Sequence, residues 1–472
     1  MEKGWVDLMA NIIIKDGTII TLDKNRRILR NGCLVIEGNR IIEVLSGKEL
    51  TSKYSSDIEI DAKGKVVLPG LINTHTHMFQ DLLRGPGDDR ELMTWLSEML
   101  YPVAKELSVS DVLAGAYLGC VEMIKTGTTC VLDNHHVNTG EEAIESVIKA
   151  MKETGIRGMV ARGIKERTKR CEIWKIPDYL FQFTPEEEVK ITEKLMKKWN
   201  NDPGKMVKVC PGPTAIFNCG PKLFLELKRL SDEYGVPIHT HVAESPEEVK
   251  STLEDYGKRE IEFLDDVGVL NDRFHVVHGV WINEREIELM AISGAHHIHC
   301  PVSNMYLASG VAPIRKLIEK GVNVALATDG PASNNNQDMF GVMKATALLQ
   351  KVSTLDPTSI TCEQVLEMAT INGAKALGLE NEIGSIEVGK KADIIIVDLN
   401  KPHSAPVHRP VSSIVYSALG SDVETVIVDG KIIMENYEIK TVDEKKIMSD
   451  AEKAAKNLAI KTGFESMLKE RK

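Results

Sequence analysis

The 472-residue sequence lacks any apolar run that could span a membrane, since a spanning helix needs about 18 consecutive apolar residues. Residues Met1 to Trp5 also lack the basic segment and apolar core that begin a secretion signal. Positive charge is not in excess, because 58 Lys and Arg stand against 69 Asp and Glu, a net charge of −11. Binding to nucleic-acid phosphates or anionic lipids requires clustered Lys and Arg. We therefore expect a cytoplasmic protein with neither nucleic-acid nor membrane partners.

Cysteine is sparse, with 8 residues and no Cys-x-x-Cys pair. This pattern excludes a disulfide framework and indicates reduced, mostly buried thiols. The sequence also lacks a Gly-x-Gly-x-x-Gly turn after any predicted strand, which disfavours a doubly wound dinucleotide-binding sheet. Hydrophobic residues make up 43% and charged residues 27% of the chain, the ordinary range of globular proteins.

Both ends of the chain contain strand-like runs rich in β-branched residues, interrupted by turn dipeptides. Asp16-Gly17, Gly38-Asn39 and Asp429-Gly430 each lie between apolar runs and predict hairpin turns. We therefore predict one small β-sandwich domain built from residues 1–67 and 383–440. The strand-like runs are Asn11–Leu22, Cys33–Val44, Ala392–Leu399 and Val423–Met434.

Between these ends, short apolar runs alternate with helix-like stretches. Apolar residues from Val112 to Ile124 follow a helical stripe, and Thr184-Pro185 and Ser245-Pro246 are helix-start signals. Eight alternations predict an α/β fold, a TIM-like (β/α)₈ barrel, over residues 68–382, with a terminal helix over residues 441–472. The predicted barrel strands are Val66–His77, Cys130–His136, Gly158–Gly163, Met206–Pro211, Pro237–Val242, Phe274–Val280, His296–Pro301 and Val322–Thr328.

Polar residues gather at the ends of four predicted strands. Residues i and i+2 of a strand point to the same side, so His75 and His77 can face one point in the barrel mouth. Three further strands end in such residues: one in His239 and His241, one in His278 and one in Asp329. Nitrogen and oxygen donors that converge from strand ends predict a catalytic metal site with an open coordination position. The pattern leaves open whether His239 or His241 is the ligand on its strand.

The fourth strand ends without a lysine, at Val209–Thr214. A carboxylated lysine there commonly bridges two metals, so we expect a single divalent ion. Such an ion lowers the pKa of bound water from about 15.7 to about 7, and Asp329 can accept the released proton. His278 can orient the water or polarise the attacked carbon. Glu244 can protonate a ring nitrogen, or alternatively it stabilises the helix start that follows it.

Six motifs stand out in the sequence: Leu68–His77, His239–Glu244, Val277–Gly279, Cys300–Asn304, Thr328–Asn334 and Ala374–Asp398. Together they resemble the amidohydrolase superfamily, in particular its ATZ/TRZ-type aminohydrolase branch. The resemblance implies one zinc ion, or iron, held by His75, His77, His241 and Asp329. It also implies Glu244 and His278 as the proton-handling pair, in a deaminase that releases ammonia from an aromatic nitrogen heterocycle.

The substrate class is less sharply defined by these motifs. Leu83-Arg84-Gly85 and Gly127-Thr128-Thr129 resemble deaminases of S-adenosylhomocysteine and methylthioadenosine. That group usually has a Glu and a His where this chain has Ala104 and Thr214. His77–Gln80 resembles guanine and 8-oxoguanine deaminases instead. We therefore favour a free purine, pterin or triazine as substrate, with a nucleoside deaminase or a triazine chlorohydrolase as alternatives.

Seven residues are predicted to contact the substrate. The Gln80 amide can read a purine edge, or cap the next segment, and Trp95 can stack or pack in the core. Arg162 could reach substrate, a neighbouring subunit or a surface carboxylate. A homodimer or larger assembly is expected, and a binding barrel without catalysis is disfavoured because every ligand position is filled. The seven are Gln80, Trp95, His135, His136, Arg162, Asn304 and Ser333.

Overall fold

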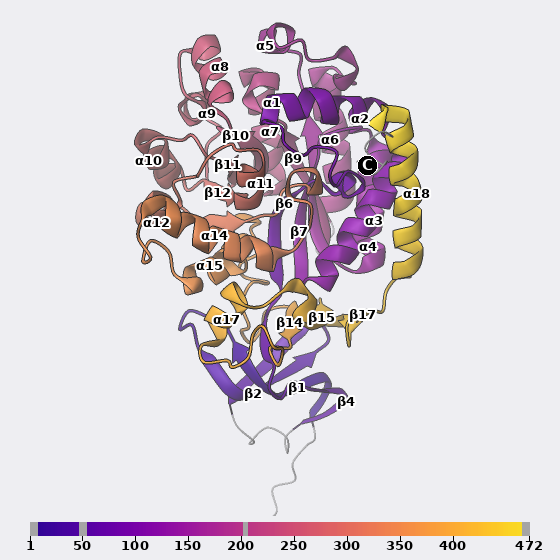
Figure 1. Cartoon of the computed structure of the whole chain (residues 1–472), viewed down its shortest axis with the longest axis vertical. Helices are drawn as coiled ribbons and strands as arrows, with labels where there is room; N and C mark the ends of the chain where they lie inside the picture. The colour runs from indigo at the N-terminus through magenta and orange to yellow at the C-terminus, as the bar shows by residue number, and fades with distance from the viewer. Residues whose placement is uncertain (1–7, 47–53, 202–205, 465–472) are drawn as a thin grey trace, which may run out of the picture.

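The computed structural model describes residues 8–46, 54–201 and 206–464. Figure 1 shows a barrel surrounded by helices and, below it, a sheet to which both the first and the last strands of the chain contribute. The predicted α/β fold with a barrel and a separate end domain is therefore confirmed.

Parallel strands form the barrel in two four-stranded sheets, ordered β6-β7-β8-β9 and β10-β11-β12-β13. A parallel bridge between Ala215 and His241 joins the sheets at one seam. At the other seam, Asp329 N donates to His75 O at 3.0 Å. The strands are β6 (Leu71–Thr76), β7 (Thr128–His135), β8 (Arg157–Ile164), β9 (Val207–Pro213), β10 (Ile238–Val242), β11 (Phe274–His278), β12 (His296–His299) and β13 (Val324–Leu326).

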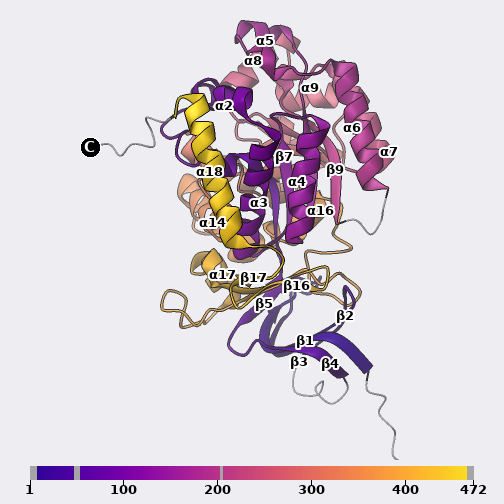
Figure 2. The ribbon, with the colours of Figure 1, turned by 90° about the vertical axis from the view of Figure 1, so that its right-hand side faces the viewer.

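Helices cover the outside of the barrel, and Figure 2 shows the carboxy-terminal helix α18 lying along α3. The α-helices are α1 (Leu92–Trp95), α2 (Tyr101–Glu106), α3 (Val109–Lys125), α4 (Glu141–Thr154), α5 (Lys169–Ile173), α6 (Pro185–Asn200), α7 (Pro221–Tyr234), α8 (Pro246–Tyr256), α9 (Glu260–Val267), α10 (Glu284–Ser293), α11 (Pro301–Tyr306), α12 (Ile314–Glu319), α13 (Pro331–Asn334), α14 (Met339–Thr354), α15 (Cys362–Met368), α16 (Ile371–Ala376), α17 (Pro410–Tyr416) and α18 (Glu444–Thr462). Shorter turns are η2 (Met78–Leu82), η3 (Leu96–Leu100), η4 (Asp178–Leu180), η5 (Ile216–Asn218) and η6 (Gly420–Asp422).

Both predicted helix starts have the expected caps. Thr184 Oγ1 accepts from Glu187 N at 3.3 Å, and the Glu187 carboxylate accepts from Thr184 N at 2.9 Å. Ser245 and Glu248 form the same reciprocal pair at the start of α8. The predicted terminal helix is α18, while residues 465–472 of that prediction lie outside the described residues.

The end sheet has nine strands, in the order β17-β16-β15-β14-β5-β1-β2-β3, with β4 beside β1. Its two halves meet where β14 pairs antiparallel with β5. Residues from both halves form one buried apolar cluster, which includes Ile14, Leu34, Ile394 and Ile427. The domain limits predicted from the sequence stay a prediction. The strands are β1 (Leu8–Ile20), β2 (Ile28–Glu37), β3 (Arg40–Ser46), β4 (Tyr54–Asp61), β5 (Val66–Pro69), β14 (Ile394–Val397), β15 (Val423–Val428), β16 (Lys431–Glu435) and β17 (Glu438–Ile439).

Two predicted elements differ from the structure. The run Val66–His77 is two strands, because the chain passes from the end sheet to the barrel at Gly70. A Cβ at Gly70 would lie 2.0 Å from Thr129 Oγ1, so this close approach requires glycine. Asp16-Gly17 is not a hairpin turn but a register shift within β1, since a positive φ of 61° at Asp16 also suits a bulge. The hairpins at residues 38–39 and 429–430 are confirmed.

The end sheet covers the amino-terminal ends of the barrel strands. Arg157, the first residue of β8, donates to Asp393 at 2.7 Å and to Asp429 at 3.2 Å. Gly70 N also donates to Asp393 O at 3.0 Å. The opposite end, where barrel enzymes carry their active sites, therefore stays free for a pocket.

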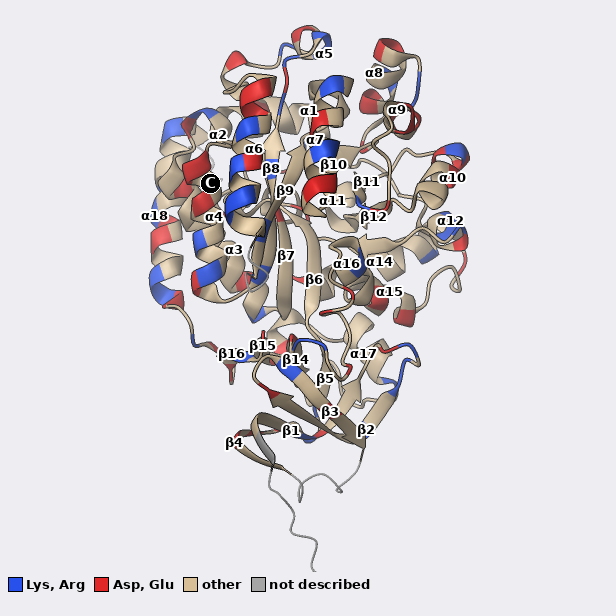
Figure 3. Cartoon of the chain, turned by 180° about the vertical axis from the view of Figure 1, so that it is seen from behind, with Lys and Arg blue, Asp and Glu red and all other residues tan. Residues whose placement is uncertain are grey.

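Charges of both signs are interspersed on the outer helices, while the barrel strands are nearly free of them (Figure 3). All eight cysteines are unpaired and buried. Among the described residues, no single helix has the length and apolarity to cross a membrane. The segments Leu92–Glu106 and Val109–Lys125 pass that test only as a pair, which is bent by 115°.

Candidate metal centre and substrate pocket

Four side chains from three strand ends meet at the open end of the barrel. Asp329 Oδ1 lies 3.3 Å from His75 Nε2 and 3.2 Å from His77 Nε2. One ligand atom from each of His75, His77 and His241 lies within 4.8 Å of the others. The four predicted ligands are thus brought together, while His239 lies behind His75 with ring centroids 4.9 Å apart.

Backbone carbonyls determine which nitrogen of two of these rings carries the proton. His77 Nδ1 lies 2.6 Å from Asn134 O, and His241 Nδ1 lies 2.7 Å from Thr214 O. A carbonyl can only accept, so Nδ1 is the donor in both rings. In each neutral ring the Nε2 lone pair is then free to bind a cation, as in other metal-binding histidines.

The arrangement fits a metal ion. His77 Nε2 and Asp329 Oδ1 face each other at 3.2 Å, a contact that a metal ion, or a proton on Nε2, between the two atoms would satisfy. His75 Nε2 is buried with no hydrogen-bond partner among the described residues, and burial lowers the pKa of this imidazole to about 3, which keeps it neutral. Three imidazoles and a carboxylate form the donor set of a metal site.

Unusual backbone angles direct the side chains that surround this site. Ala243, His278 and Asp329 have positive φ angles of 50°, 67° and 61°. Non-glycine residues rarely adopt this region, and such strained positions concentrate at functional sites. The turns occur directly after β10, at the end of β11 and after β13, where Glu244, His278 and Asp329 leave their strands.

Glu244 and His278 lie side by side above the donor set. His278 Nε2 is 3.5 Å from Glu244 Oε2 and 4.0 Å from Asp329 Oδ2. On its other side, His278 Nδ1 lies 2.9 Å from Asn304 Oδ1. Burial, and secondly the charge of Asp329, raise the pKa of Glu244 to about 8. Ser309 Oγ donates to this carboxyl at 3.3 Å. The pair can therefore hold and move a proton beside the donor set.

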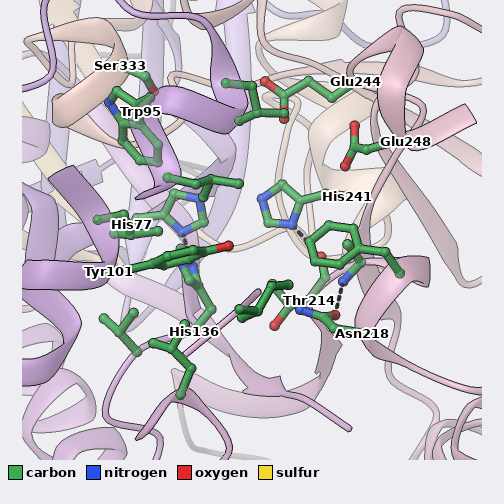
Figure 4. Close-up of a pocket in the computed structure, with 18 of the residues that line it drawn as sticks. His77, Trp95, Tyr101, His136, Thr214, Asn218, His241, Glu244, Glu248 and Ser333 are labelled. Atoms are coloured by element: carbon green, nitrogen blue, oxygen red, sulfur yellow. Dashed lines mark hydrogen bonds between the residues drawn. The ribbon is translucent and has the colours of Figure 1, made fainter. Parts of the chain in front are cut away.

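A pocket opens outward from these residues (Figure 4). His77 and His241 lie near its centre, with Trp95 and Ser333 on one side and Glu244 and Glu248 on the other. Most of the remaining wall is apolar and comes from loops and short helices above the barrel. These apolar residues are Leu92, Leu96, Leu100, Val137, Ile176, Leu180, Ala215, Phe217 and Leu307.

Four of the predicted substrate residues line this pocket. Gln80 Oε1 accepts from Ala332 N at 3.3 Å, and Trp95 Nε1 donates to Ala332 O at 3.1 Å. Ser333 Oγ donates to Asp329 Oδ2 at 3.2 Å. His136 completes the set. Each polar group except His136 is thus held by the loop after β13.

Three other predicted contacts lie outside the pocket lining. Arg162 is fully buried and bonds Glu188 at 2.5 Å, so it reaches neither substrate nor the protein surface. Its side chain instead lies in the layer between β8 and α6, where Glu188 belongs to α6. His135 packs edge-on against Phe79, with ring centroids 5.7 Å apart. Asn304 contacts His278, as described above, and does not line the pocket.

The sequence analysis did not single out several polar residues of the pocket wall. Lys165, Asn218 and Glu248 all line it. Lys165 Nζ donates to His136 O, and desolvation lowers the pKa of this amine to about 8. Burial raises the pKa of Glu248 to about 7. Glu248 was visible only as the third residue of a helix start, a pattern that predicts a cap rather than a pocket residue.

Comparisons with known proteins agree with this geometry. The family model described as Amidohydrolase family matches residues 66–433. The chain is 40% identical over 453 residues to a 5′-deoxyadenosine deaminase of Methanosarcina mazei, covering 96% of this chain and 99% of the relative. It is 40% identical over 448 residues to a 5-methylthioadenosine/S-adenosylhomocysteine deaminase of Thermoanaerobacter pseudethanolicus, covering 95% and 99%.

A solved structure shares the whole architecture. It is an adenosine deaminase from Xanthomonas campestris with bound zinc, 30% identical, with a TM-score of 0.90, covering 96% of this chain and 100% of that one. Family model, relatives and structure all extend over the barrel, including the strand ends that hold the donor set. The chain therefore belongs to the amidohydrolase family and is a hydrolase that acts on carbon–nitrogen bonds.

Proposed function

We propose that this protein deaminates a 5′-modified adenosine, replacing the 6-amino group of the purine with oxygen and releasing ammonia. The observation that carries the proposal is the 40% identity, over at least 95% of the chain, to deaminases of 5′-deoxyadenosine and of methylthioadenosine or S-adenosylhomocysteine. These relatives reverse the order favoured by the sequence motifs, in which a free purine, pterin or triazine came first.

The two departures from the nucleoside group do not exclude a ribose. Ala104 is not part of the pocket wall, whereas Thr214 lines it, with Oγ1 donating to Ile164 O at 3.2 Å. The wall instead offers the Glu248 carboxyl and the Asn218 amide. A carboxylate and an amide can both accept hydrogen bonds from ribose hydroxyls, and we assign them this role.

We propose zinc as the metal, held by His75, His77, His241 and Asp329, because the similar adenosine deaminase structure contains zinc. Zinc in such a site supplies Lewis acidity, which lowers the pKa of water to about 7. The protein's own groups would do the remaining work. Asp329 accepts a proton from the attacking water, and His278, oriented by Asn304, holds that water toward C6 of the purine.

Glu244 is assigned the transfer of protons to the substrate. Its raised pKa keeps a proton on the carboxyl near neutral pH, available for N1 of the purine as water adds at C6. As the C6–N bond breaks, Asp329 passes the proton it accepted to the departing amino group, and the hydroxyl proton of the adduct returns to the Glu244 carboxylate. One water is consumed and one ammonia released, so the reaction balances without an oxidant or reductant.

The outer wall favours a small, uncharged group at the 5′ position. If the 6-amino group lies at the donor set, a 5′ substituent directed outward would meet apolar residues of η3, η4 and η5, including Leu100, Leu180 and Phe217, which line the pocket. A 5′-methyl or methylthio group is stabilised there by burial. The charged end of S-adenosylhomocysteine would lose hydration against the same wall.

The proposal is tested by ammonia release from a panel of compounds, with zinc content measured on the same sample. The panel contains 5′-deoxyadenosine, methylthioadenosine, S-adenosylhomocysteine, adenosine, guanine and 8-oxoguanine. We expect the highest kcat/KM for the first two, at least about 10-fold above S-adenosylhomocysteine, which corresponds to about 1.4 kcal/mol of transition-state binding. Highest turnover of guanine or 8-oxoguanine would overturn it, as would chloride release from a chlorotriazine in preference to any nucleoside.

A further inference from the structure

A continuous chain of three imidazoles crosses the barrel behind the metal site. His75 Nδ1 lies 2.7 Å from His239 Nε2, and His239 Nδ1 lies 2.9 Å from His275 Nδ1. The chain ends at the carbonyl of Ala376, the last residue of α16, which is 2.7 Å from His275 Nε2. All three rings are fully buried, so solvent cannot replace any of these contacts.

The carbonyl at the end of the chain sets the direction of every proton in it. Ala376 O can only accept, so His275 must carry its proton on Nε2 and accept through Nδ1. His239 must then donate from Nδ1 and accept through Nε2. His75 must therefore donate from Nδ1, which leaves its Nε2 lone pair facing the donor set.

This row of three imidazoles explains how His75 has the same tautomer as His77 and His241, with the proton on Nδ1. The Nδ1 protons of His77 and His241 go directly to the carbonyls of Asn134 and Thr214. His75 has no carbonyl at its Nδ1 and reaches one only through two other rings. Reversal at any ring would place two N–H donors, or two lone pairs, face to face in a buried position.

We infer that His239 and His275 are positioning residues, which fix the tautomer and orientation of His75 through the carbonyl of Ala376. The inference rests on the metal site of the proposed function but not on the identity of the substrate. It assigns a role to His239, left open by the sequence, and to His275, which the strand-end pattern did not select. Outer partners of metal-binding histidines commonly affect metal affinity by about 10–100-fold.

The test combines histidine tautomers and zinc affinity in the full-length protein. In metal-free wild type with ¹⁵N-labelled histidine, long-range ¹H–¹⁵N NMR should place the protons on Nδ1 of His75 and His239 and on Nε2 of His275. A proton on Nε2 of His75 in this state overturns the inference, and this measurement needs no variant.

Zinc affinity, measured by competition with a chelator, gives the second readout. His275→Leu removes the acceptor for His239, and we expect zinc to bind about 10–100-fold more weakly. His275→Asn keeps an oxygen acceptor near the Nδ1 position and should bind zinc more tightly than His275→Leu. The matched control is His299→Leu. His299 is another fully buried strand histidine, but it is not one of the three linked imidazoles, so this variant should bind zinc as wild type does.

Equal zinc affinity in wild type and His275→Leu would overturn the inference, as would an equal loss in the His299→Leu control. If His275→Leu does not fold, the wild-type tautomers decide. A failure of the proposed substrate would appear only in the ammonia assay, whereas a failure of this inference would appear in the tautomers and zinc affinity.

Discussion

Two barrel strands carry the same His-x-His spacing in opposite orientations. On β10, His239 and His241 point inward, where they meet His75. On β12, His297 and His299 lie beside Val324 and Leu326 of β13, which belong to the layer between barrel and helices. The intervening Ile298 belongs to the barrel interior. The spacing alone therefore does not make a site, because the phase of the strand decides which side the rings occupy.

The environments of the two pairs differ as strongly as their positions. Each nitrogen of His239, and Nδ1 of His241, has a defined partner. Neither ring nitrogen of His299 has a hydrogen-bond partner among the residues that the structure describes. We therefore expect substitutions of the inward and the outward histidines to have unlike effects.

The largest effect is expected from the inward ligand. His241→Ala removes one of the four donors proposed for zinc and should weaken zinc binding by more than the roughly 10–100-fold typical of an outer partner, with activity lost in parallel. Metal content and ammonia release on the same sample check this. Full zinc occupancy and activity in His241→Ala would show that His241 of β10 is not a zinc ligand.

Glu244→Gln, just beyond β10, should lower kcat by about 10²–10⁴-fold, because the amide cannot transfer the proton. Zinc content should stay as in wild type, since Glu244 is not one of the four donors. Single-turnover ammonia release separates the chemical step from substrate binding. A variant with unchanged kcat and altered KM would instead make Glu244 a binding residue.

A smaller effect is expected at Asn304, which holds His278 through a 2.9 Å contact. Asn304→Leu removes this acceptor and should reduce kcat about 10–100-fold, as for other outer partners. Asn304→Asp retains an acceptor and serves as the matched variant. Loss of substrate affinity without loss of kcat would restore Asn304 to the substrate contacts predicted from the sequence.

The smallest effect on activity is expected on β12. His299→Leu removes two unpartnered ring nitrogens and should leave zinc binding and kcat unchanged, while raising the free energy of unfolding by about 1 kcal/mol. Calorimetry and chemical denaturation measure it. A fall in stability of several kcal/mol would show that the outward ring is satisfied in the folded protein.

The same variant also predicts a pH dependence. Burial lowers the pKa of His299 well below its usual value, so below about pH 6.5 the unfolded state binds a proton that the folded state refuses. Stability therefore falls as pH decreases, by about 1.4 kcal/mol per pH unit for one such group. His299→Leu should reduce this slope by that amount, and an unchanged slope between pH 6.5 and 5 would contradict it.

The strand-end pattern predicted the barrel and the convergence of the four donors, because strand ends in a barrel share one rim. It could not predict Arg162 as a buried ion pair, since a charged residue on a strand usually suggests a site or a surface. Lys165, Asn218 and Glu248 were missed because loop packing, rather than strand phase, brings them to the pocket. The role of His275 depends on contacts between three elements that no local pattern records.

The antiparallel pairing of β5 with β14 also constrains how the chain assembles during synthesis. Domains form largely in the order in which the ribosome releases them, but β5 has its second neighbour only after residues 394–397 have been made. During translation of the whole barrel, one edge of β5 therefore lacks its native partner. An unpaired edge is a template for wrong association, and β5 keeps such an edge until β14 has been synthesised.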